Sequence, residues 1–189
     1  MIIAKGGDVV LRELTKSDIP KLAEYANNEK VSINLRDAFP FPYTQEDARC
    51  FLEMVDRQQP KTFLAIAYNN NYAGNISLLP GTDVYKKSAE IGYFIGEPFW
   101  NKGIMTKAVR MMTDFGFKQL DLVRIHTGVF EYNKASQRVL EKCGFKKEGV
   151  FEKAIFKKNN FYNEIRYALL KEVEKDTDEP MIANSSQKK

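Results

Sequence analysis

The sequence has few of the residues on which metal and disulfide chemistry depend. It contains one histidine, His126, and two cysteines, Cys50 and Cys143. A single histidine excludes sites with two histidine ligands, which include most catalytic zinc centres, so we predict no metal site. Two thiols build no disulfide framework, and we interpret both cysteines as buried free thiols.

Long apolar runs and a strong excess of one charge are also lacking. The chain has no apolar run of the roughly 18 residues that a membrane helix needs, and its first residues show no basic segment followed by an apolar one. The formal net charge is +4, from 29 basic and 25 acidic residues. This mild excess permits contact with an anionic cofactor but does not favour direct binding of nucleic acid. We expect a cytoplasmic protein that crosses no membrane, either a monomer or a homodimer.

The composition that remains is typical of one folded domain. Hydrophobic residues make up 43% and charged residues 29% of the chain, which is ordinary for a globular protein. From about Glu174 the sequence becomes polar with little to bury. We predict a single domain over residues 1–173 and a mobile tail over residues 174–189.

The stretch Ser88–Val109 organises the chain. Glu90–Ile95 is rich in apolar and aromatic residues, which predicts a strand, and Pro98 ends it because proline has no N–H for a ladder. A helical pattern begins near Lys102, with Gly103 at its entrance. The free N–H groups of a helix N-terminus attract phosphates, although most strand–loop–helix joints bind nothing. The loop matches neither a nucleotide P-loop nor a dinucleotide fingerprint.

The other elements follow from periodicity and turn residues. Thr15, Thr44 and Asn133 are typical helix N-caps, and Gly144 is typical of a helix C-cap. Asn69–Asn71 predicts a hairpin turn, and Gly74 a bulge or a close approach. The predicted strands are Asp8–Glu13, Lys61–Tyr68, Tyr72–Leu79, Val123–Phe130, Phe145–Phe156 and Phe161–Leu170, and the predicted helices include Lys16–Asn27.

Two motifs carry a family resemblance. They are A-E-I-G-Y-F-I-G-E-P-F-W-N-K-G-I-M-T-K-A and N-K-A-S-Q-R-V-L-E-K-C-G-F-K-K-E-G. The sequence resembles the GCN5-related N-acetyltransferases (GNAT), and within them the branch of the ribosomal-protein N-terminal acetyltransferases. The resemblance implies an α/β (α+β) fold with a mixed, mostly antiparallel twisted sheet of about seven strands and helices on both faces. It also implies direct transfer of an acetyl group from acetyl-CoA to a primary amine in a ternary complex.

The resemblance implies a set of cofactor contacts. Backbone groups of Phe94 and Ile95 would meet the pantetheine arm, Asn133 would bond it, and Ser136 would face the thiol. The pyrophosphate would be held by the N–H groups of Lys102, Gly103, Ile104, Met105 and Thr106. Met105 stands where the family prefers a smaller residue, and Lys107 adds positive charge near the anion.

Catalytic roles follow from the demands of acetyl transfer. The tetrahedral oxyanion needs a donor, which we assign to the Ile95 amide. Leu140 stands where many relatives have an acidic tyrosine, so we assign assistance of the leaving thiolate to Ser136. We assign the general base to Glu90. A merely solvated Glu90 carboxylate and a His126 base stay open as alternatives.

The acceptor side is less defined. Aromatic residues in the loop Val31–Tyr43 either plug the core or line a ligand site. The family comparison makes Asn34, Arg36, Phe39 and Tyr43 candidate acceptor contacts. The acceptor is a protein N-terminal α-amine or a small-molecule amine, and the lack of a dense acidic cluster favours a peptide or a neutral amine over a polyamine. A non-catalytic acyl-CoA-binding or sensing module is the alternative function.

Overall fold

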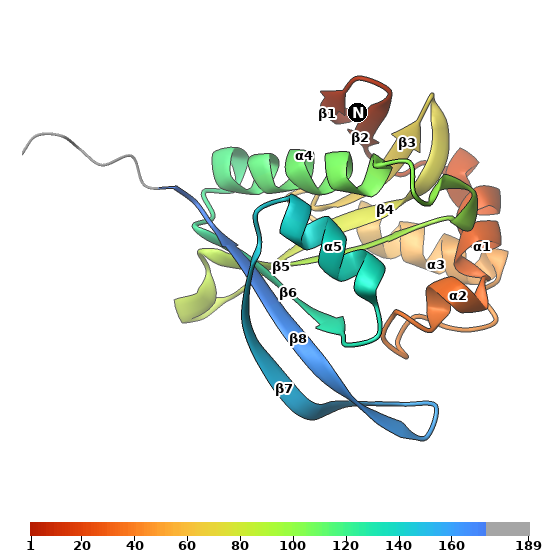
Figure 1. Cartoon of the computed structure of the whole chain (residues 1–189). Helices are drawn as coiled ribbons and strands as arrows, with labels where there is room; N and C mark the ends of the chain where they lie inside the picture. The colour runs from red at the N-terminus through yellow and green to blue at the C-terminus, as the bar shows by residue number, and fades with distance from the viewer. Residues whose placement is uncertain (173–189) are drawn as a thin grey trace, which may run out of the picture.

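A computed structural model describes residues 1–172 as one twisted eight-stranded sheet with helices packed on it (Figure 1). The predicted mobile tail, residues 174–189, lies outside the described residues. The strands are β1 (Ile2–Gly6), β2 (Val9–Arg12), β3 (Phe63–Tyr68), β4 (Asn71–Pro80), β5 (Ser88–Ile95), β6 (Arg124–Phe130), β7 (Lys146–Lys157) and β8 (Asn160–Leu170). The α-helices are α1 (Ile19–Ala26), α2 (Glu29–Ser32), α3 (Gln45–Asp56), α4 (Ile104–Gln119) and α5 (Lys134–Lys142).

The sheet order is β1-β2-β3-β4-β5-β6-β8-β7, and every neighbouring pair is antiparallel except β5 and β6. This confirms the mixed, mostly antiparallel sheet. The sheet has one strand more than the approximate count expected, because the first residues form β1 and pair with β2. The first predicted strand, residues 8–13, corresponds to β2 alone.

The alternation of side chains along each strand separates two cores. Leu64 and Ile66 of β3 face α4 and α5, in a core that also contains Met112 and Leu140. Ala65 faces the other way, into a core built with α1 and α3. Helices therefore cover both faces of the sheet, as predicted (Figure 1).

The local signals for caps and turns are confirmed. Thr44 starts α3 through a capping box with Asp47, and Asn133 starts α5 by accepting from the Ser136 N–H. Gly144 takes φ +86° after α5, and Asn69 and Asn70 take positive φ in the β3–β4 turn. The prediction for the cysteines is wrong in part. Both are free, but Cys50 lies on the exposed side of α3 and only Cys143 is half-buried.

The decisive irregularity is the pairing of β5 with β6. The two strands pair at three positions, Ser88 with Arg124, Ala89 with Ile125 and Glu90 with His126. Beyond Glu90, β5 stays paired with β4 as far as Ile95, while β6 stays paired with β8 as far as Phe130. The two halves of the sheet therefore part after Glu90 and His126.

Gly74 fixes the place of β5 against β4. The β3–β4 register shifts beside Gly74, which confirms the predicted bulge. A Cβ at Gly74 would lie 2.2 Å from the backbone oxygen of Phe94 and 2.8 Å from the Cα of Ile95. The glycine is required because the backbone of β5 leaves no space for a side chain.

We expect Gly74→Ala to destabilise the fold by about 1–3 kcal/mol, because backbone atoms must move to admit the methyl group. Gly149→Ala in β7 is the matched control, since the nearest atom to its new Cβ lies 3.8 Å away on a side chain. Urea unfolding of both variants measures the difference. Equal stability of Gly74→Ala and wild type would show that β5 is free to shift.

Candidate active site

The opening between β5 and β6 is lined by free backbone groups of β5. Ser88 O accepts from Gly81 N at 2.8 Å, and Gly96 N donates to Ala73 O at 2.9 Å. In an antiparallel ladder the residues alternate in the side to which their backbone groups point. The N–H of Ile95 therefore points toward the opening. The predicted contact of the Phe94 backbone with the pantetheine arm is corrected, because the Phe94 backbone faces β4. The Ile95 carbonyl accepts from Trp100 Nε1 at 2.9 Å, which leaves its N–H as the group available to a ligand.

The entrance of α4 lies at the end of the loop that follows β5. Gly103 is the N-cap with φ +72°, and no side chain caps the helix. The first helical bond runs from Lys107 N to Gly103 O at 3.1 Å, so the N–H groups of Ile104, Met105 and Thr106 have no helical acceptor. The first turn has no acidic residue. These donors and the helix dipole together form a candidate anion-binding site.

The ammonium group of Lys107 does not add an unpaired charge to this anion-binding site. Its ammonium lies 2.5 Å from Asp8 Oδ1, in the turn between β1 and β2. This bond lowers the pKa of Asp8 and keeps the carboxylate ionised. The predicted contribution of Lys107 to the anion is corrected accordingly, because its charge is shared with Asp8.

Asn133 and Ser136 stand at the start of α5. The Asn133 Oδ1 atom accepts from Ser136 N at 3.1 Å, and the hydrogen bonds within residues 1–172 leave Asn133 Nδ2 without an acceptor. Ser136 Oγ lies 2.8 Å from the hydroxyl of Tyr93 on β5. Burial raises the pKa of Tyr93 well above its ordinary value, so this hydroxyl stays protonated. Leu140 is fully buried in the core.

Glu90 and His126 form the last pair before the strands part. Ala89 and Ile91 face the α4 core, so the side chain of Glu90 lies on the opposite face of the sheet. Arg36 pairs with Glu90 there. Burial, and then the charge of Arg124, lower the pKa of His126, so its imidazole is neutral at pH 7.

The predicted acceptor contacts separate in the structure. Arg36 reaches Glu90 and is exposed, and Phe39 packs edge-on against Phe94 at 5.6 Å between ring centroids. Asn34 Nδ2 bonds to Lys30 O at 2.9 Å. The interpretation of Tyr43 as an acceptor contact is corrected, because its side chain belongs to the α1–α3 core and burial raises its pKa to about 12.

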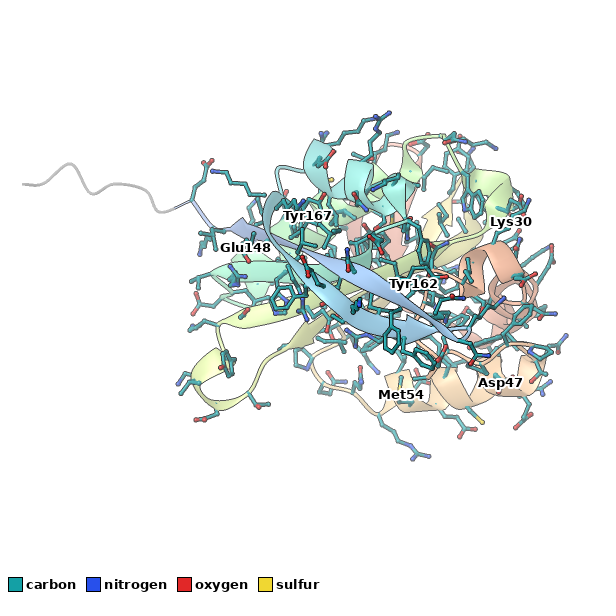
Figure 2. All side chains as sticks on the ribbon, turned by 60° about the horizontal axis from the view of Figure 1, so that its bottom comes forward. Lys30, Asp47, Met54, Glu148, Tyr162 and Tyr167 are labelled. Atoms are coloured by element: carbon teal, nitrogen blue, oxygen red, sulfur yellow. The ribbon has the colours of Figure 1, made fainter. Side chains whose placement is uncertain are left out.

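The hairpin of β7 and β8 and the segment after β6 contact the loop of residues 31–43, which the sequence did not predict. Lys157 Nζ donates to Leu35 O at 2.5 Å and to Asp37 Oδ1 at 2.8 Å, and only 8% of its side chain is exposed. The hydroxyl of Tyr132, which follows β6, donates to Ile33 O at 2.6 Å. Figure 2 shows the hairpin running from Glu148 and Tyr167 at one end past Tyr162 toward the end of the molecule that carries Lys30.

Asn163 has a structural place in the same hairpin. Its Oδ1 accepts from Lys153 N at 2.9 Å, where the β7–β8 register shifts between Phe151 and Ile155. The Asn163 N–H donates to Glu131 Oε1 at 2.8 Å. Asn163 therefore holds the β7 bulge in place.

A cavity of about 560 Å³ opens beside the paired start of β5 and β6. Its lining includes Ser88, Arg124, His126, Tyr85 and Phe151. The charged residues that line it are Lys87, Arg124, Arg166 and Glu148. The cavity therefore combines apolar surface with more basic than acidic groups.

Comparison with known proteins decides the family. A sequence profile of the acetyltransferase (GNAT) domain matches residues 8–146. The chain belongs to the GNAT acetyltransferase family. This GNAT protein is an N-acetyltransferase, as its relatives are. It is 28% identical over 169 residues to the SPbeta prophage-derived uncharacterized N-acetyltransferase YokL of Bacillus subtilis, covering 88% of this chain and 92% of YokL.

Other relatives and solved structures agree with this assignment. The spermidine N(1)-acetyltransferase of Escherichia coli is 26% identical over 167 residues, covering 85% of each chain. The microcin C7 self-immunity acetyltransferase MccE, solved with acetyl-CoA and AMP, has a TM-score of 0.74 at 26% identity, with 87% of this chain and 93% of MccE covered. RimL, a ribosomal L7/L12 α-N-protein acetyltransferase solved with coenzyme A, shares the fold with a TM-score of 0.80 at 23% identity, with 90% and 98% covered. Within residues 1–172 of this GNAT protein, none of the helices has the length and apolarity to cross a membrane.

The lowered pKa of His126 predicts a pH dependence of stability. The unfolded chain binds the His126 proton near the ordinary pKa of 6.5, whereas the folded chain resists it. Stability from this residue is therefore present above that pH and is lost as the pH falls through it. We expect wild type to lose more unfolding free energy than His126→Gln between about pH 7.5 and about pH 5.5, measured by urea unfolding. Equal losses of unfolding free energy in wild type and His126→Gln would contradict a lowered pKa of His126 in the folded protein.

Proposed function

We propose that this protein transfers an acetyl group from acetyl-CoA directly to a primary amine. The observation that carries the proposal is the parting of β5 and β6 next to an uncapped helix entrance. The Ile95 N–H, the amides of Ile104–Thr106 and the free Nδ2 of Asn133 all offer donors to one extended ligand. Acetyl-CoA has acceptors to match, in its thioester carbonyl, its amides and its pyrophosphate.

The relatives support this choice of cofactor. MccE and RimL were solved with acetyl-CoA and with coenzyme A. In the present chain the pyrophosphate would lie on the amides from Lys102 to Thr106, and the pantetheine arm would follow β5 toward Ile95. Asn133 would donate to the arm from α5, and Ser136 would face the sulfur.

The chemistry needs no covalent enzyme intermediate. With both substrates held together, proximity supplies a large part of the rate. The acceptor nitrogen attacks the thioester carbon, the Ile95 N–H stabilises the oxyanion, and Glu90 takes the proton from the nitrogen. Arg36 must release Glu90 when the amine binds, because both compete for the same carboxylate oxygens.

For the acceptor we propose a peptide α-amine or another amine without several positive charges. The cavity beside His126 is lined by apolar and basic groups, and this lining suits the body of such an acceptor. One relative is named for spermidine, but a polycation would need a cluster of acids that this cavity lacks. The cavity reaches His126, the pair partner of Glu90, so Glu90 would meet the amine just beyond this end of the cavity.

A charge at Gly103 tests the cofactor site. We expect Gly103→Asp to weaken acetyl-CoA binding about tenfold or more, because its carboxylate repels the pyrophosphate at close range. Gly103→Asn is the matched control, since asparagine tolerates positive φ equally well and adds no charge. Isothermal titration measures both. Equal affinity of the Asp and Asn variants would place the pyrophosphate elsewhere.

Release of CoA thiol with a panel of amines and N-terminal peptides tests the reaction. We expect turnover with peptides, less with spermidine, and a loss of about 100-fold in kcat for Glu90→Gln, which removes the base. Glu46→Gln is the control, because Glu46 also pairs with an arginine, Arg49, on α3. Acetyl-CoA binding without thiol release on the whole panel would instead support the acyl-CoA-binding module.

A further inference from the structure

The hydrogen bond between Tyr93 and Ser136 joins the two sides of the opening. Tyr93 lies on β5 beyond the last pair with β6, and its ring packs against the α4 core. Its hydroxyl lies 2.8 Å from Ser136 Oγ on α5. Neither hydroxyl has another hydrogen-bond partner among the described residues.

The chemistry of the two groups fixes the direction of this bond. The Tyr93 side chain packs against the α4 core, and its hydroxyl has no other acceptor among the described residues, so its proton is satisfied only when it points at Ser136 Oγ. Tyr93 therefore donates to Ser136 Oγ, which has two acceptor lone pairs. The proton of Ser136 is then free to point into the opening. A hydroxyl that already accepts a hydrogen bond is also a better donor, because successive hydrogen bonds polarise one another.

We propose that Tyr93 is a positioning residue that turns the Ser136 hydroxyl toward the sulfur of the thioester. The inference rests on the proposed function. As the C–N bond forms and the C–S bond breaks, the electron pair of the C–S bond goes to sulfur and the amine proton goes to Glu90. The thiolate leaves while it accepts a hydrogen bond from Ser136, and it takes a proton from solvent after release. Neither Tyr93 nor Ser136 gives up its proton.

This arrangement accounts for the lack of an acidic side chain at Leu140. A serine alone is a poor acid, but a hydrogen-bond donor to a thiolate needs only to be placed and polarised. Hydrogen bonds to charged groups are worth more than neutral ones. The bond therefore favours the state in which the sulfur carries charge.

A double-mutant cycle tests the coupling. We expect Tyr93→Phe and Ser136→Ala each to lower kcat about tenfold with unchanged affinity for acetyl-CoA, and the double variant to lose no more than the larger single loss. Tyr72→Phe is the control, because this buried tyrosine on β4 donates to Asn75 Oδ1 instead, at 2.9 Å. Losses that multiply in the double variant, or full activity of Tyr93→Phe, would overturn the inference.

A second measurement needs no acceptor. The pKa of the thiol of bound CoA, followed by the ultraviolet absorbance of its thiolate, should be lower in wild type and Tyr72→Phe than in Tyr93→Phe or Ser136→Ala. If wild type acetylates no amine but the bound thiol titrates as expected, the proposed function fails and the Tyr93–Ser136 role stands. If the pKa of the bound thiol is the same in wild type, Tyr93→Phe and Ser136→Ala, the proposed role is overturned, whatever the turnover.

Discussion

The loss of pairing between β5 and β6 after Glu90 and His126 determines the rest of the site. Each strand remains paired on its outer side, β5 with β4 and β6 with β8. Each strand is therefore fixed by its outer neighbour while its inner edge stays unpaired. Unpaired backbone groups in such a place are costly unless a partner satisfies them. A ligand with amide groups along its length is the natural partner.

The sheet also divides the chemistry between its two faces. The helix entrance at Gly103 and the pair of Asn133 and Ser136 belong to the α4 and α5 side. Glu90, His126 and the loop that carries Arg36 lie on the other face. Acetyl-CoA and the acceptor would thus approach from opposite sides and meet at Ile95 and Glu90, where the strands part. Direct transfer needs this meeting and no covalent step.

The sequence predicted the elements that depend on local chemistry. The caps at Thr44 and Asn133 and the Asn69–Asn71 turn are each set by one or two residues. The family resemblance implies backbone contacts of this strand with the pantetheine arm, but nothing local in Glu90–Ile95 encodes the parting of β5 and β6. The Arg36–Glu90 pair, the Lys157 contact with Leu35 and the place of Tyr93 beside Ser136 join residues far apart in the chain. Such contacts depend on how the strands are ordered, which periodicity does not show.

The same reason explains the corrections. Tyr43 lies in a loop rich in aromatic residues, and such loops can line a ligand site. The packing of α1 on α3 buries its side chain instead. Lys107 lies one turn into α4 and would serve an anion, yet Asp8 from the β1–β2 turn lies within bonding distance. In both positions a tertiary contact decides the role of the residue.

Backbone amide exchange in the presence of CoA tests the central claim most directly. The account predicts new protection at Ile95 and at the amides from Gly103 to Thr106, with little change at the neighbouring amides of β4. Protection confined to other parts of the molecule, with those amides exchanging as in the free protein, would contradict the claim that the parted strands and the helix entrance hold one ligand.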